Sequence, residues 1–252
     1  PLAGGHALVT GGGTGIGAAI AGALAAAGAA VTLLGRRREP LEATARAIGG
    51  ASVVTADVTE AADAVRACAE AHAANGAISI LVNNAGAAHT APFAQSRFED
   101  WRRILAVNLD ALHHMTLAAL PDLRSVPHGR IITIASTAGA RGYAYATAYC
   151  AAKHGALGFT RALALELART PVTVNAVCPG FAETDMVAQS IDRIVAKTGR
   201  SPEEAHAELA RFNPQGRLVA PGEVADAVLF LARPAASAIT GQAIMVAGGE
   251  VT

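Results

Sequence analysis

Residues 10–17, TGGGTGIG, lie between a short apolar run, His6–Thr10, and an alanine-rich segment, Ile16–Ala27. The apolar run has the length of a buried strand, and the alanine-rich segment has helical spacing and ends at Gly28. Glycines at such a turn let the backbone approach a pyrophosphate, and a helix N-terminus offers it unpaired N–H groups. The stretch predicts a nucleotide-binding strand–turn–helix unit, the alternative being a plain structural turn.

The same alternation of short apolar runs and longer helical segments continues along the chain, as in the βαβ units of a parallel sheet. Most runs are apolar throughout, as expected for strands that are covered on both faces. Seven strands are expected, at His6–Thr10, Ala30–Leu34, Ser52–Ala56, Ile78–Asn83, Ile131–Ala135, Val172–Val177 and Ala243–Val246. Helices are expected at Ile16–Ala27, Glu39–Ile48, Glu60–Asn75, Phe98–Leu120 and Ala151–Ala168. The predicted fold class is α/β, a single doubly wound Rossmann domain over residues 1–252 with a seven-stranded parallel sheet.

One region departs from this alternation. Between Val177 and Ala243 the chain has helical segments at Phe181–Thr198, at Pro202–Phe212 and after Pro221. A long insertion of helix and loop at the carboxyl edge of a sheet is typical of an active-site lid. Residues 181–215 are therefore predicted to form a substrate-binding lid.

Composition and charge exclude several classes of function. The chain is 52% hydrophobic, and its 20 basic and 20 acidic residues give no net charge. We therefore expect no nucleic-acid or membrane partner, and a small-molecule substrate instead. No apolar run reaches the roughly 18 residues of a membrane span. Cys68, Cys150 and Cys178 are widely spaced, which predicts free thiols, a reducing compartment and a cytoplasmic location.

Three motifs together identify a family resemblance. Gly11, Gly15 and Gly17 have the spacing GxxxGxG, NNAG occupies residues 83–86, and Tyr149 and Lys153 are spaced YxxxK. In this order they resemble the short-chain dehydrogenase/reductase (SDR) family over essentially the whole chain, nearest in appearance to 3-oxoacyl reductases and polyketide ketoreductases. The resemblance implies an oxidoreductase that transfers a hydride between NAD(P) and a carbonyl or secondary alcohol. It also implies a homotetramer built through the long central helices and the C-terminal strand.

The resemblance, together with residue chemistry, assigns the reacting groups. Tyr149 and Lys153 are four residues apart and face one side of a helix. A tyrosine has a pKa of about 10, and a nearby ammonium, helped by the positive nicotinamide ring of the oxidised cofactor and by partial burial, is expected to lower it. Ser136 ends a strand, where its hydroxyl can donate to a carbonyl oxygen. The family assigns Ser136, Tyr149 and Lys153 as the catalytic triad and Asn108 as the holder of a water. Taken singly, each has a structural alternative, in packing, a turn or a helix kink.

The resemblance also implies a cofactor site. Asp57 contacts the adenine with help from Val58, although Asp57 could instead cap a helix that begins near Thr59. Further contacts are implied at Gly11, Gly13, Thr14, Gly15, Ile16 and Gly17, at Asn83, Asn84, Ala85 and Gly86, at Tyr149 and Lys153, and at Pro179, Gly180 and Thr184.

The residues after the second strand indicate which dinucleotide binds. An acidic residue there would bind the ribose 2′-OH of NAD, but this chain has Gly35 followed by Arg36 and Arg37. A guanidinium can bind a 2′-phosphate through two charge-assisted hydrogen bonds. NADP(H) is therefore the predicted cofactor, with Arg36 as the main ligand and Arg37 as the second. NAD(H), with a merely solvated arginine run, is the alternative.

The substrate is expected to meet an apolar, partly aromatic edge. The residues that form it are Ser136, Ala138, Tyr143, Tyr145, Phe181 and Met186. They favour a hydrophobic ketone, or a 3-oxoacyl thioester whose carrier phosphates meet Arg193, Lys197 and Arg200. The alternatives are an NAD-dependent dehydrogenase of secondary alcohols or 3-hydroxyacyl-CoA in a degradative pathway, and a catalytically silent dinucleotide-binding subunit. Cys178 is expected to pack, and His113, His114 and His154 lack the spacing of a metal site, so no metal is predicted.

Overall fold

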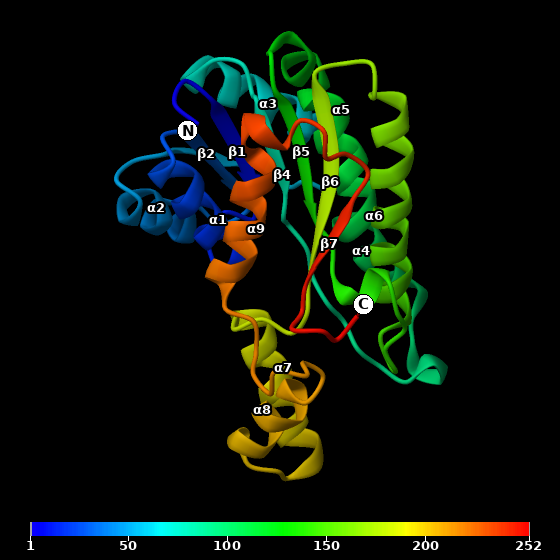
Figure 1. Cartoon of the computed structure of the whole chain (residues 1–252). Helices are drawn as coiled ribbons and strands as arrows, with labels where there is room; N and C mark the ends of the chain where they lie inside the picture. Colours follow the sequence, from blue (N-terminus) through cyan, green and yellow to red (C-terminus); the bar gives the residue numbers. More distant parts are fainter. Residues whose placement is uncertain (1, 252) are drawn as a thin grey trace.

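Seven parallel strands form one sheet in the order β3-β2-β1-β4-β5-β6-β7 (Figure 1). The computed structural model describes residues 2–251. The strands are β1 (His6–Thr10), β2 (Ala30–Gly35), β3 (Ser52–Thr55), β4 (Ile80–Asn83), β5 (Gly129–Ile134), β6 (Val172–Pro179) and β7 (Ala243–Val246). The predicted α/β Rossmann fold is confirmed. The chain order reverses between β1 and β4, and in open α/β sheets ligands bind at the carboxyl end of such a point.

The register of the strands aligns their carboxyl ends. Leu8 of β1 pairs with Thr32 of β2 and Leu81 of β4, and Asn83 at the end of β4 pairs with Thr133 of β5. The turns that follow β1, β4 and β5 therefore emerge at the same edge. This alignment brings the glycine-rich turn, the NNAG turn and Ser136 to one side of the sheet.

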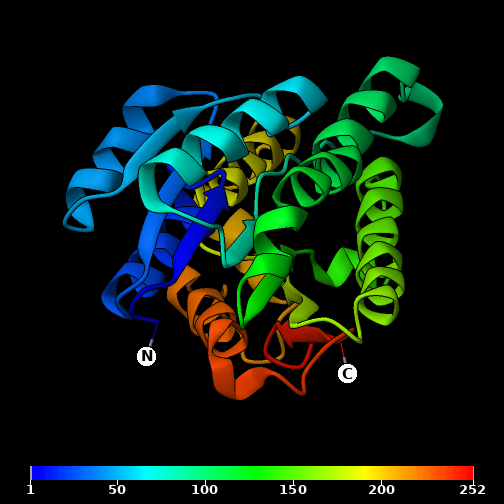
Figure 2. The same ribbon diagram turned by 90° about the horizontal axis from the view of Figure 1, so that it is seen from above.

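Two layers of helices cover the two faces of the sheet (Figure 2). On one face, α1 (Gly15–Ala26), α2 (Arg38–Ala47) and α9 (Pro221–Ala232) share a core with one side of the strands. On the other face, α3 (Ala61–Asn75), α5 (Ala111–Ser125) and α6 (Thr147–Glu166) share a second core. Both faces are buried, which explains why the strands are apolar throughout.

The helix predicted over Phe98–Leu120 is interrupted, and this part of the prediction was wrong. The structure has α4 (Phe98–Leu105), a π-helical turn (Ala106–Asp110) and then α5. Asn108 lies in the π-helical turn, and its side-chain amide donates to the carbonyl of Ile104, four residues back, at 2.9 Å. The π-helical turn thus coincides with a buried side-chain hydrogen bond, which the spacing of apolar residues in the sequence cannot reveal. Such turns recur at functional sites.

The segment after β6 forms a lobe that stands beyond the carboxyl edge of the sheet (Figure 1). It contains α7 (Asp185–Thr198) and α8 (Pro202–Ala210). The lobe has its own small core, which includes Val187 and Leu209. A parallel bridge between Ala182 and Val219 joins its two ends, so the lobe extends a few residues past the expected boundary at 215.

Candidate active site

The glycine-rich turn is shaped by contacts that leave no room for side chains. Gly11 and Gly15 have φ angles of 65° and 52°, in the left-handed region that favours glycine. A Cβ on Gly17 would lie 2.2 Å from the carbonyl oxygen of Gly11 and 2.5 Å from Nδ2 of Asn84. Thr14 is the N-cap of α1, and its side chain makes no capping bond. The bare turn and the open first turn of α1 fit a pyrophosphate.

Thr10 joins the glycine-rich turn to the NNAG turn, a role that the motif search missed. Its Oγ1 accepts hydrogen bonds from the backbone N–H groups of Asn84 and Ala85, both at 2.9 Å. Asn84 in turn donates from Nδ2 to the carbonyls of Thr10, at 2.9 Å, and Gly11, at 3.2 Å. The sequence did contain a signal for this role, a threonine at the end of a strand and directly before the glycines.

Ser136, Tyr149 and Lys153 come together at the carboxyl end of β5. Lys153 is 5% exposed, and its Nζ donates to the carbonyl of Ile134 at 2.8 Å. The same Nζ lies 5.6 Å from the centre of the Tyr149 ring. Ser136 Oγ accepts from the N–H of Ala138 at 3.1 Å, which orients its side chain. Because α6 begins at Thr147, four residues before the predicted start, Tyr149 lies inside the helix with Lys153.

The pKa of Tyr149 does not follow the expectation drawn from the YxxxK spacing. Burial raises the pKa of its phenol to about 12, and the hydroxyl of Ser136 acts in the opposite direction. Burial also lowers the pKa of Lys153 to about 8. Desolvation of the buried phenol is the largest contribution to the Tyr149 pKa. Tyr149 is therefore a neutral phenol at neutral pH, the form that donates a proton.

Asn108 is 1% exposed and lies beside the NNAG turn. Its Nδ2 donates to the carbonyls of Ala87, at 2.8 Å, and Ile104. Its Oδ1 has no hydrogen-bond partner within residues 2–251, and a Cβ on Gly86 would lie 2.8 Å from it. A buried carbonyl oxygen in this position is an acceptor suited to an ordered water.

Asp57, Arg36 and Arg37 lie at the ends of β2 and β3. Asp57 Oδ1 accepts from the N–H of Thr59 at 3.0 Å and from its hydroxyl at 2.7 Å. The capping role considered for Asp57 thus applies to this turn and not to the first turn of α3, which begins at Ala61. Arg36 is 77% exposed at its side chain and lies 3.8 Å from Asp57 Oδ2. Arg37 is exposed at the N-cap of α2.

The remaining cofactor residues surround the same edge. A Cβ on Gly15 would lie 3.2 Å from the methyl group of Thr184, the N-cap of α7, so the start of α7 and the glycine-rich turn are adjacent. Pro179 is the last residue of β6. Gly180 donates from its N–H to the carbonyl of Val246 at 3.1 Å. Gly13 is half-exposed and lies against α2, and the side chain of Val58 is buried in the second core, which leaves its backbone for the contact that the resemblance implies.

Three aromatic rings form a wall between the segment after β5 and the lobe. The centroid of the Tyr143 ring is 6.0 Å from that of Phe181 and 5.7 Å from that of Phe212, and the latter two are 5.2 Å apart. Phe212 was not among the predicted substrate residues, because it lies more than thirty positions from Phe181. Met186 is 38% exposed on α7. Ala138 is buried instead, and its role in the structure is the backbone bond to Ser136.

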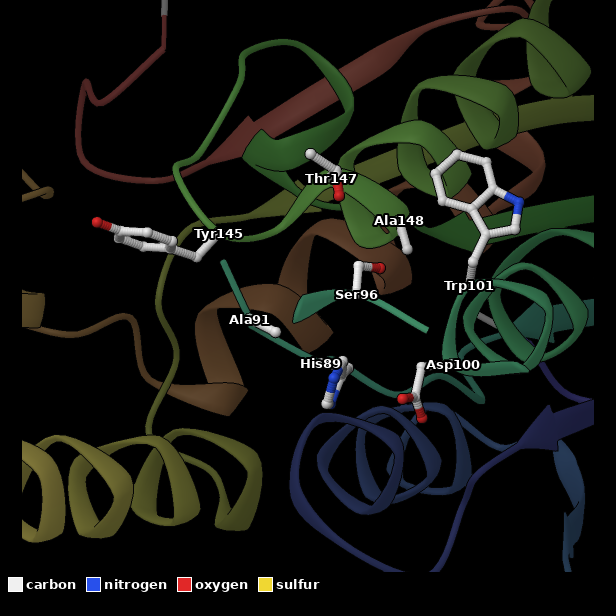
Figure 3. A pocket seen from close by; sticks show the side chains of 8 residues that line it. All are labelled: His89, Ala91, Ser96, Asp100, Trp101, Tyr145, Thr147 and Ala148. Carbon is white, nitrogen blue, oxygen red and sulfur yellow. The ribbon is translucent and has the colours of Figure 1, made fainter. Parts of the chain in front are cut away.

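Tyr145 lies apart from this wall. Its φ of 67° is the one positive value among the non-glycine residues 2–251, and the residue is 64% exposed. Its ring points away from a small cavity of about 10 Å³ (Figure 3). The other residues that line this cavity are His89, Ala91, Ser96, Asp100, Trp101, Thr147 and Ala148. The structure therefore does not bring Tyr145 together with the other predicted substrate residues.

Two further features concern chemistry outside this set. Burial raises the pKa of Cys178 to about 11, so its thiol is not a nucleophile at neutral pH.

In the part of the chain that the structure describes, His, Cys, Asp and Glu side chains do not gather in threes as a metal ion would require. Among the same residues, no helix has both the length and the apolar character to cross a bilayer.

Comparisons with known proteins place the chain among the short chain dehydrogenases. The family model for short chain dehydrogenases matches residues 5–194. The chain is 41% identical over 249 residues to a putative ketoacyl reductase of the granaticin polyketide synthase of Streptomyces violaceoruber, covering 96% of this chain and 92% of that one. It is 39% identical to D-beta-hydroxybutyrate dehydrogenase of Cupriavidus necator, covering 99% of both. A crystal structure of an actinorhodin polyketide ketoreductase variant with NADPH has a TM-score of 0.93, at 39% identity, covering 98% of this chain and 97% of that one.

Proposed function

Because the chain belongs to the short-chain dehydrogenase family, we propose that it reduces a hydrophobic ketone or 3-oxoacyl thioester with NADPH. The family makes it an NAD(P)-linked oxidoreductase that acts on carbonyl and alcohol carbons. The proposal adds the cofactor, the substrate class and the roles of individual residues. The observation that carries the proposal is the convergence of Ser136, Tyr149 and Lys153 at the same edge of the sheet as the glycine-rich turn.

The residues of the carboxyl edge would hold the dinucleotide. The glycine-rich turn and the first turn of α1 bind the pyrophosphate, Asp57 the adenine, Lys153 the nicotinamide ribose and Thr184 the carboxamide. When bound, the nicotinamide supplies the hydride that reduces the carbonyl carbon, or accepts it in the reverse direction. Every other part of the reaction is carried by side chains of this protein.

Four side chains handle the substrate oxygen and its proton. Ser136 donates a hydrogen bond to the oxygen as negative charge develops on it. Tyr149 then gives its proton to that oxygen, which agrees with a phenol held neutral by burial. Lys153 and the Oδ1 of Asn108 then conduct a replacement proton from solvent, through water, to the Tyr149 phenolate. A silent nucleotide-binding subunit would have no use for this arrangement.

The cofactor preference rests on Arg36 and gives a direct prediction. Its guanidinium is largely exposed at the end of β2, and its nearest acid is 3.8 Å away. Replacing Arg36 with alanine should lower kcat/KM for NADPH by about tenfold and leave that for NADH nearly unchanged, since only NADPH carries the 2′-phosphate. Initial rates with both cofactors measure the ratio. An unchanged ratio would show that Arg36 does not bind the 2′-phosphate. Arg37→Ala measures the smaller contribution to 2′-phosphate binding that is assigned to Arg37.

The lobe supports the substrate class. We propose that residues 181–215, with the return strand to Val219, form the substrate lid, whose wall is Tyr143, Phe181 and Phe212. Arg193 and Lys197 are exposed on α7 and could meet the phosphates of a carrier. Arg200 forms an ion pair with Glu208, so it contributes less than was expected.

A substrate panel tests the assignment. With NADPH, acetoacetyl-CoA should have a higher kcat/KM than small aryl ketones, because it meets both the aromatic wall and the cations of α7. The same preparation with NAD⁺ and 3-hydroxybutyrate tests the degradative alternative, which draws support from the likeness to a hydroxybutyrate dehydrogenase. Faster oxidation of that acid than reduction of acetoacetyl-CoA at neutral pH would favour the alternative over our proposal.

The proposal extends to assembly and location. Leu117 on α5 is 61% exposed and Leu165 on α6 is 81% exposed, and these apolar groups suit helix pairing between subunits of a homotetramer. Cys68, Cys150 and Cys178 are free thiols, as suits the cytoplasm.

A further inference from the structure

A carboxylate near the C-terminal end of the described chain is buried behind the aromatic wall. The side chain of Glu250 is 1% exposed. The hydroxyl of Tyr143 donates a hydrogen bond to its Oε1. The oxygen of Tyr143 also lies 2.7 Å from Oγ1 of Thr137, which donates to it because the phenolic hydrogen is already engaged. Two hydrogen bonds thus connect Glu250 to the residue that follows Ser136.

The second carboxylate oxygen of Glu250 faces the end of β6. A Cβ on Gly180 would lie 2.9 Å from Oε2, and Oε2 has no hydrogen-bond partner within residues 2–251. Gly180 directly follows β6, and Tyr143 belongs to the segment that follows β5, so the carboxylate lies between these two segments. A buried acceptor without a partner in the protein can accept from a donor on a substrate and repels another anion.

The charges around Glu250 do not cancel its own. Arg141 lies 3.9 Å from Oε1 and has its guanidinium 5.1 Å from the centre of the Tyr143 ring, but its side chain is 43% exposed and shares its charge with solvent. Burial raises the pKa of Glu250, whereas the Tyr143 bond and Arg141 act to lower it. Tyr143 supplies a neutral donor only. The Glu250 carboxylate therefore keeps an uncompensated negative charge near the segment that follows Ser136.

We propose that Glu250 is a specificity residue, which admits neutral 3-oxo esters, thioesters and ketones and disfavours ketones that carry a free carboxylate next to the reacting group. The inference rests on the proposed function, because it assumes that the carbonyl binds at Ser136. It explains why a chain similar to both ketoacyl reductases and a hydroxybutyrate dehydrogenase should act on the thioester and not on the free acid. The excluded anion would share a poorly solvated region with the Glu250 carboxylate, where screening is weak.

The test compares matched substrates in wild type and Glu250→Gln. Methyl acetoacetate and acetoacetate differ in one charge, which the carboxylate of the acid carries. Oxidation of NADPH measures the reduction of both substrates. At about pH 8, where carboxylic acids are ionised, wild type should prefer the ester. Glu250→Gln keeps an acceptor for Tyr143 and should raise kcat/KM for acetoacetate by about tenfold or more, with the ester changed by less than about threefold.

A second variant separates charge from positioning. Tyr143→Phe removes the hydrogen bond to Glu250 and leaves the carboxylate in place. The ratio of kcat/KM for the ester to that for the acid should therefore stay high, even if both values fall. If Glu250 only positioned Tyr143, each of the two variants would lower kcat/KM for the ester and for the acid by the same factor. That result would overturn the proposal. An unchanged ratio in Glu250→Gln would overturn it equally.

A failure of the proposed function would look different. Methyl benzoylformate and benzoylformate form a second pair of neutral and anionic ketones, with the carboxyl group next to the carbonyl and without a 3-oxoacyl group. Should wild type reduce the ester of this pair and neither acetoacetyl-CoA nor methyl acetoacetate, the 3-oxoacyl assignment would be lost. The effect of Glu250→Gln on the ratio of kcat/KM for the two benzoylformate substrates would still decide the role of Glu250.

Discussion

Replacing Tyr149 with phenylalanine should lower kcat by about a thousandfold or more, because it removes the proton donor and leaves the ring in place. The phenol is neutral at working pH, since burial holds its pKa at about 12, and it lies beside Ser136 and Lys153. Phenylalanine fills the same volume, so the fold and the NADPH site should survive. The measurements are kcat with acetoacetyl-CoA and the Kd of NADPH from fluorescence titration.

Tyr145 provides a matched control for this substitution. It is the tyrosine nearest to Tyr149 in the sequence, it is 64% exposed, and its ring points away from the neighbouring cavity (Figure 3). Tyr145→Phe should therefore keep most of the activity. Turnover by Tyr149→Phe within about tenfold of wild type would show that another group supplies the proton. A loss of NADPH binding in that variant would indicate a structural effect instead.

The second large effect is expected from Gly17→Ala, which should weaken NADPH binding by about a hundredfold or more. The new methyl group would lie 2.2 Å from the carbonyl oxygen of Gly11 and 2.5 Å from the amide of Asn84. Because both neighbours belong to the hydrogen-bonded junction of the two turns, either the turn opens or α1 moves away from it. Both changes displace the N–H groups that meet the pyrophosphate. Fluorescence titration with NADPH and thermal unfolding without cofactor measure the two consequences.

Gly22→Ala is the control for this change, because it is the same substitution in the same helix. The nearest atom to the added methyl group is a methyl of Ile48 at 3.7 Å, which is ordinary contact. Alanine is the better helix former, so Gly22→Ala should stabilise the protein by about 0.5 to 1 kcal/mol and leave the Kd of NADPH unchanged. If Gly17→Ala bound NADPH as tightly as Gly22→Ala, the glycine-rich turn would not be the pyrophosphate site.

Much of the architecture could be predicted from local patterns. The apolar runs from His6 to Val246 correspond to the seven strands, and the helical spacing of their connections corresponds to the helices on both faces. These patterns depend on hydrogen bonds within one element and on which face is buried, and neighbouring residues encode both. The YxxxK spacing likewise placed Tyr149 and Lys153 on one side of α6.

Other features depend on residues far apart in the chain, and only the tertiary structure decided them. Thr10 and Asn84 are 74 positions apart, and Tyr143 and Glu250 are 107 apart. The π-helical turn at Asn108 accompanies a bond to the carbonyl of Ala87 in another segment. The pKa of Tyr149 rose where the YxxxK spacing predicted a fall, because burial depends on every element packed around the phenol. The spacing of apolar residues determines the helices and strands because neighbouring residues decide which face of each element is buried. Burial of the phenol and hydrogen bonds between residues far apart in the chain arise only when the strands and helices pack together at the edge of the sheet.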